Sequence, residues 1–175
     1  MIKHADSVEA VRAQYRPTVI RTLFVGESAP HSGKFFYFGN TPMTRHMMRA
    51  IEAMFGKTED FLATFKAYGW FLDDMVKTPV NQLHGRERQT ACGAAINDLA
   101  IRIALYRPEA IVCLMRGIEC YVNAAADVAC SDVPRYSVPF PGNGQQGRFN
   151  TEISKILPKL PRNPVSPARI RSHAL

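Results

Sequence analysis

Four short apolar runs, separated by segments long enough for helices, constrain the fold of this chain more than any other feature. The runs cover residues 19–25, 70–72, 110–115 and 136–138. Their β-branched and aromatic side chains are typical of buried strands. Strands joined by crossovers of this length pair in parallel, with helices on both faces of the sheet. We therefore expect an α/β domain, a three-layer α/β/α sandwich around a central four-stranded parallel sheet.

Helical patterns fill the segments between these runs. The clearest helix carries apolar residues at positions 92, 96, 99, 103 and 106 and stops before Arg107-Pro108. Further helices are predicted near residues 7–15, 43–55, 61–68, 118–126 and 149–157, and the polar segment 77–89 is expected to be a loop. Because 175 residues suit one domain, we place a single domain over residues 1–157.

The charge balance indicates an anionic partner. Lys and Arg outnumber Asp and Glu by 22 to 15, and the net charge is +7. Residues 158–175 contain four basic residues and no acid, with prolines at positions 158, 161, 164 and 167. This spacing favours an extended polyproline conformation, so we expect a basic, Pro-rich C-terminal tail. Nucleic acid is the commonest partner of such a protein.

Other classes of protein are excluded by what the sequence lacks. No apolar run reaches the roughly 18 residues of a membrane helix, and the first residues contain no apolar signal core. The cysteines, at positions 92, 113, 120 and 130, form no C-x-x-C pair. We therefore expect a cytoplasmic protein, a monomer without a membrane partner, with reduced cysteines, no metal and no cofactor.

Unusual segments follow all four predicted strands, and they point to one site. Ligands of an open parallel sheet bind beyond the carboxyl ends of its strands. The segments are residues 26–33, 73–74, 115–117 and 139–148. Pro30 breaks the G-x-S-x-G frame of a nucleophile elbow. The phosphate-binding frame G-x-x-x-x-G-K-[ST] and the dinucleotide fingerprint G-x-G-x-x-G are both absent.

Four segments of the chain, taken in order, resemble the uracil-DNA glycosylase superfamily. Residues 23–30 (LFVGESAP) resemble that family's first motif, a strand ending in G-E-x-P or G-Q-D-P. Residues 71–79 (FLDDMVKTP) are similar to the TNVVKCRP segment of its thermostable bacterial branch. Residues 99–114, with RPEAIV at 107–112, resemble its P-x-x-I-V-x-L-G helix and strand. Residues 138–144 (VPFPGNG) stand where the family has its H-P-S-P loop.

The resemblance implies an α/β/α domain that binds DNA and excises a uracil-type or other damaged base by hydrolysing the N-glycosidic bond. Glu27 matches the Glu of the G-E-x-P branch, and Asp74 stands where that branch has Asn. Such an enzyme must take a base out of the stack, hold it and stabilise charge as the bond breaks. We take Glu27 and Asp74 as the catalytic candidates.

The neighbouring segments supply the binding candidates. The base-binding candidates are Ser28, His31, Phe36 and Phe38, because aromatic rings stack on a flipped base and a histidine can donate to its oxygen. The DNA and phosphate-binding candidates are Arg116, Asn143, Gln145 and Arg148, which offer guanidinium and amide donors. The sequence leaves open whether single- or double-stranded DNA is bound.

Two other functions remain open on the sequence. Phe140 stands where the family has its transition-state His, and Ser28 and Ala29 occupy the neighbourhood of its activating Asp. These departures favour a catalytically inactive nucleic-acid or nucleotide-binding protein on the same fold. A small-molecule hydrolase or transferase that uses Glu27 and Asp74 is the other alternative. Kinship of fold alone does not separate the three functions.

Overall fold

One parallel sheet of four strands forms the centre of the molecule. The computed structural model of the chain describes residues 2–165. The strands are β1 (Thr22–Gly26), β2 (Trp70–Asp74), β3 (Ala110–Cys113) and β4 (Arg135–Ser137). They lie in the order β2-β1-β3-β4, and every neighbouring pair is parallel. The predicted four-stranded parallel sheet is confirmed.

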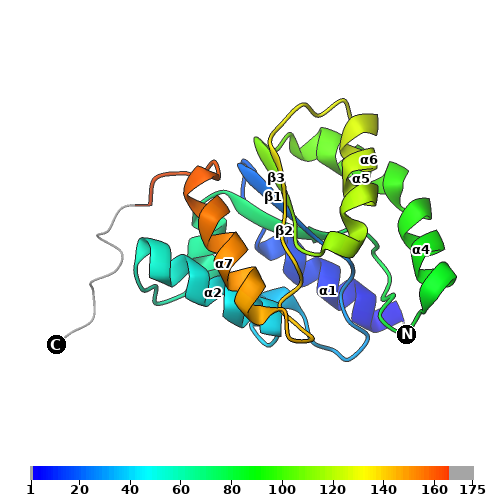
Figure 1. Cartoon of the computed structure of the whole chain (residues 1–175), viewed down its shortest axis with the longest axis horizontal. Coiled ribbons are helices and arrows are strands. Elements are labelled where there is room, and N and C mark those ends of the chain that lie inside the picture. The colour runs from blue at the N-terminus through cyan, green and yellow to red at the C-terminus, as the bar shows by residue number, and fades with distance from the viewer. Residues whose placement is uncertain (1, 166–175) are drawn as a thin grey trace.

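Helices cover both faces of this sheet. They are α1 (Ile2–Gln14), α2 (Pro42–Phe55), α3 (Phe61–Ala67), α4 (Gly85–Ala94), α5 (Ile96–Tyr106), α6 (Glu119–Val128) and α7 (Gln146–Ile156). Short 3-10 turns are η1 (Phe36–Phe38), η2 (Arg116–Ile118) and η3 (Leu157–Lys159). In Figure 1, α4, α5 and α6 lie on one side of the sheet and α2 and α7 on the other, so the predicted three-layer sandwich is confirmed. No helix within residues 2–165 has the length and apolar character needed to cross a membrane.

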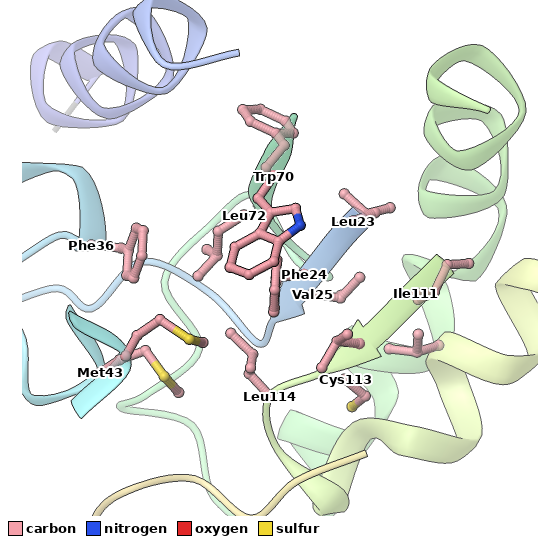
Figure 2. Close-up of a cluster of buried hydrophobic side chains, with 14 of the residues drawn as sticks. Leu23, Phe24, Val25, Phe36, Met43, Trp70, Leu72, Ile111, Cys113 and Leu114 are labelled. Carbon is pink, nitrogen blue, oxygen red and sulfur yellow. The ribbon is translucent and has the colours of Figure 1, made fainter. Parts of the chain in front are cut away.

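Aromatic side chains fill the core between the sheet and the helices on the α2 side. The Phe24 ring lies 5.5 Å from the Trp70 ring and 5.2 Å from the Phe65 ring. The Phe36 ring extends this cluster, 5.4 Å from Phe65. Figure 2 shows Trp70 beside Phe24, with Phe36 and Met43 approaching from the helical layer. The Phe24–Trp70 pair is edge-on and the other two pairs are tilted. Aromatic pairs add about 0.5–1.5 kcal/mol each to the burial of apolar area.

The segment before the third strand differs from the prediction. Residues 85–89 were expected in a loop, but they form the first half of α4. Gly85 permits this start because its φ of +48° lies in the left-handed region. The helix expected over residues 92–106 is two helices. α4 ends at Ala94, and the N–H of the C-cap residue Ala95 donates to the carbonyls of Ala91 and Cys92. The extra turns of α4 carry Arg88, which matters for the site.

The first residues of the expected tail pack on the domain. The Pro161 carbonyl accepts hydrogen bonds from Thr22 Oγ1 at 2.8 Å and from Trp70 Nε1 at 2.9 Å. The Asn163 N–H donates to the Tyr68 carbonyl at 2.9 Å. These contacts tie the chain beyond η3 to the amino-terminal ends of β1 and β2. The rest of the predicted tail, residues 166–175, lies outside the described residues.

Candidate active site

A cavity of about 420 Å³ opens at the carboxyl edge of the sheet, where the sequence predicts a site. Its walls come from the segment after β1, from η1 and the start of α2, and from the ends of β2 and β3. Phe140 and Asn143, from the loop after β4, complete the lining. The cavity is the size of a typical small-molecule pocket. All four segments that follow or end a strand therefore meet in one place.

Asp73 and Asp74 are neighbours in β2 but serve different parts of the molecule. Successive side chains of a strand point to opposite faces of the sheet. Asp73 faces the α5 layer and is fully buried, whereas Asp74 lines the cavity and is 5% exposed. The alternation of the strand thus assigns one carboxylate to the framework and the other to the site.

Asp74 presents one carboxylate oxygen to the cavity. Its Oδ2 accepts a hydrogen bond from Arg12 Nη2 at 2.6 Å. Its Oδ1 accepts no hydrogen bond from the described residues. Among these residues, Ser137 Oγ is the one fully enclosed side-chain polar atom without a partner, so Asp74 Oδ1 is not enclosed by protein. Asp74 Oδ1 is therefore open to the cavity. Burial raises the pKa of Asp74 above its usual value, and the Arg12 guanidinium opposes this rise.

Glu27 also lines the cavity, but both of its oxygens are engaged. Arg88 of α4 binds it with two hydrogen bonds, from Nε to Oε1 at 2.7 Å and from Nη2 to Oε2. The hydrogen bond to Glu27 raises the pKa of Arg88. A bidentate pair of this kind fixes the orientation of both groups. Of the two predicted catalytic carboxylates, Asp74 is the one with a free oxygen.

The predicted base-binding residues divide into two pairs. Ser28 and Phe36 line the cavity, and Ser28 Oγ accepts the Val80 N–H at 3.1 Å. His31 and Phe38 are not part of the lining. His31 lies beside it, since its N–H donates to the side chain of Asn81, which does line the cavity. Phe38 is 39% exposed.

The predicted phosphate-binding residues are mostly outside the cavity. Asn143 lines it, in a left-handed conformation with φ of +49°. Arg116 pairs instead with Glu152 of α7 at 2.5 Å. Arg148 Nη1 donates to the Gln145 side-chain oxygen at 3.4 Å, at the start of α7. Of these four residues, Asn143 therefore lines the cavity. Arg116 of η2 is not part of the lining, and neither are Gln145 and Arg148 at the start of α7.

Asp73 is the centre of a buried ion network. Arg102 Nη1 donates to its Oδ2 at 2.5 Å, and the Tyr106 hydroxyl donates to the same oxygen at 3.1 Å. Lys77 Nζ donates to its Oδ1, and Arg12 Nη1 lies 3.3 Å from that atom. Burial by itself would raise the pKa of Asp73, but the three cations outweigh it and lower the pKa to about 2.

Two site residues, Arg12 and Arg88, were missed by sequence reasoning. Each partner lies about sixty positions away, with separations of 62 for Arg12 and Asp74 and 61 for Arg88 and Glu27. No local pattern links such pairs. A weak signal did exist for Arg12, because a buried helix face seldom carries an arginine unless a carboxylate lies opposite.

No family model matches the chain, and no curated protein is significantly similar to it. Within residues 7–165, no group of three or more His, Cys, Asp or Glu residues is arranged to hold a metal ion. Burial raises the pKa of the Cys92 thiol, and of the Cys113 thiol to about 11. The cavity and its carboxylates are therefore the features that bear on function.

Replacing Gly26 by Ala is expected to disturb Asp74. A Cβ at position 26 would lie 2.6 Å from Asp74 Oδ1, closer than real contacts allow. We expect Gly26→Ala to lower the free energy of unfolding by about 1–3 kcal/mol, as overpacking does elsewhere. Urea denaturation measures the change. Gly117→Ala is the control, because a Cβ there meets nothing within 4 Å; equal losses in the two variants would contradict the prediction.

Proposed function

We propose that the protein binds a nucleobase of DNA in this cavity and hydrolyses its N-glycosidic bond. One observation carries the proposal: each of the four segments that resemble the uracil-DNA glycosylase superfamily contributes to the lining. They supply residues 26–30, the pair Leu72 and Asp74, Leu114, and the pair Phe140 and Asn143. Any parallel sheet brings the carboxyl ends of its strands to one edge, so the support lies in the side chains that these segments place in the cavity walls.

The chemistry of the walls suits a flat heterocycle. Apolar surface comes from Phe36, Met43, Leu114 and Phe140, and Figure 2 shows three of these side chains around the end of β1. Aromatic faces stack on bases of any kind, which is worth about 1–3 kcal/mol per base. Polar groups of Ser28, Asn143 and Asp74 would meet the edges of the ring. A base reaches such a cavity only after it leaves the helical stack.

In the proposed reaction, Asp74 is the proton acceptor. Its open Oδ1 takes a proton from water, and the water oxygen bonds to C1′ of the deoxyribose. The C1′–N bond breaks with its electron pair passing to the base, which takes up a proton. A carboxylate near C1′ also stabilises the positive charge that develops on the sugar. In this scheme Glu27 orients Arg88 at the wall and does not meet the water.

An excision assay tests the proposed function. Short DNA carrying uracil, hypoxanthine, xanthine or a mismatch is incubated with the protein, and alkali then cuts any abasic site. We expect cleavage at one of these bases, in single- or double-stranded DNA. Binding to DNA should weaken steeply with salt, since the chain has a net charge of +7. Absence of cleavage on every substrate would contradict hydrolysis.

A second candidate is a nucleic-acid or nucleotide-binding protein that does not hydrolyse its ligand. The Glu27–Arg88 pair favours it, because one of the two expected catalytic carboxylates is already neutralised by a bidentate partner. Salt-dependent DNA binding without any abasic product in the same assay is the result that this function predicts.

A further inference from the structure

Arg12 reaches the floor of the cavity from α1, a helix that lies outside all four motif segments. Its side chain is 3% exposed. Nη2 donates to Asp74 Oδ2 at 2.6 Å, and Nη1 donates to the Leu72 carbonyl at 3.3 Å. The guanidinium carbon lies 4.9 Å from the centre of the Phe35 ring. Asp74, Leu72 and Phe35 all line the cavity, so one buried side chain supports three of its residues from behind.

The edge position of β2 explains why a side chain takes this place. β2 is the outer strand next to β1, so the backbone on its far side has no strand partner. At Leu72, the Tyr37 hydroxyl donates to the carbonyl and accepts from the N–H, and Arg12 supplies a second donor. The Tyr37 ring in turn stacks on Tyr15, which follows α1, at 5.0 Å. The N-terminal helix therefore completes the strand that carries Asp74.

Few charged groups surround the Asp74 carboxylate, and Arg12 is the cation that touches it. Asp73 and Lys77 approach from β2 and the turn that follows. The Glu27–Arg88 pair and Lys34 line the same cavity. Arg102 of α5 contacts Asp73 and the Asp74 backbone carbonyl, but not the Asp74 side chain. Removing Arg12 thus leaves a buried carboxylate without its direct counter-ion, whereas removing Arg102 does not.

We propose that Arg12 is the positioning residue of this site: it holds Asp74 in the orientation that turns Oδ1 to the cavity and makes α1 part of the active centre. Oδ2 is held by the guanidinium, and Oδ1 is left as the acceptor. Burial raises the pKa of Asp74, and Arg12 limits that rise. The catalytic consequence rests on the proposed function, but the control of Asp74 by Arg12 does not.

The experiment compares Arg12→Gln, Arg12→Lys and the control Arg102→Gln in the full chain. The titration of the Asp74 carboxyl is followed by carbon NMR of the labelled protein. We expect Arg12→Gln to raise the Asp74 midpoint by about 1–3 pH units, because an opposite charge in contact has been removed. Arg12→Lys keeps a positive charge, so its Asp74 midpoint should lie between that of Arg12→Gln and that of the unchanged protein. Arg102→Gln should leave the midpoint in place.

The same variants are then compared in single-turnover excision. The acidic limb of the pH–rate profile should move with the Asp74 midpoint in Arg12→Gln and stay in place in Arg102→Gln. An Asp74 midpoint that is unchanged in both Arg12 variants overturns the inference, even if the rate falls, because a purely structural arginine would give that result. If neither the unchanged protein nor any variant excises a base, the proposed hydrolysis is contradicted. The NMR titration still decides the role of Arg12 in that case.

Discussion

Asp73→Asn is expected to lower the free energy of unfolding by about 3–5 kcal/mol, because removing one partner of a buried ion network leaves the others uncompensated. Asp73 is fully buried and contacts Arg12, Lys77 and Arg102. An amide cannot neutralise these three cations, of which Arg12 is 3% exposed and Arg102 is 11% exposed. Urea denaturation at neutral pH measures the loss.

Asp98 provides the matched control for this substitution. It pairs with Arg102 Nη2 at 3.0 Å, but its side chain is 62% exposed. Exposed pairs contribute roughly 0–1 kcal/mol, so Asp98→Asn should change stability little. Losses of similar size in Asp73→Asn and Asp98→Asn would show that the network is not the source of stability that the burial of Asp73 implies.

The loss of folding stability at acid pH should depend on the Asp73 carboxylate. The pKa of Asp73 falls from 3.8 to about 2 on folding. A lowered pKa stabilises the folded state above the unfolded value, and that stability is lost as the pH falls from about 4 to about 2. The loss amounts to about 2 kcal/mol by linkage. In Asp73→Asn this part of the pH dependence should disappear.

Asp74→Asn is expected to reduce the rate of base excision by about 10²–10⁴-fold, the usual contribution of a positioned general base. An amide has the shape of the carboxylate but takes no proton from water. Affinity for DNA should change much less than the rate, since phosphate contacts supply most of the affinity. Single-turnover excision and a binding titration at one salt concentration separate the two effects.

Glu27→Gln is the comparison for Asp74→Asn. Glu27 has both oxygens bound by Arg88, so its loss should alter the cavity wall and lower the rate less than the loss of Asp74 does. A larger effect at position 27 would move the role of proton acceptor from Asp74 to Glu27. It would also mean that the Arg88 pair opens when substrate binds.

Local patterns in the sequence were sufficient to predict the three layers of the fold and the edge of the sheet at which the site lies. Apolar runs of strand length, separated by helices, pair in parallel whatever their detailed contacts, and parallel strands present all their carboxyl ends at one edge. The order of the residues therefore placed Glu27, Asp74 and Asn143 near each other before any contact was known. Ser28 and Phe36 followed from their positions in the same segments.

Tertiary structure decided which of these groups are free to act. The strand alternation of β2 gives Asp73 to the ion network and Asp74 to the cavity. Only the docking of α1 and α4, however, brings Arg12 to Asp74 and Arg88 to Glu27. Similarly, the start of α7 turns Arg148 away from the cavity and leaves Asn143 in its wall. Charge pairing acts through space over a few ångströms, and partners about sixty positions apart share no local pattern. The sequence therefore determined the place of the site, and the packing of distant helices determined its chemistry.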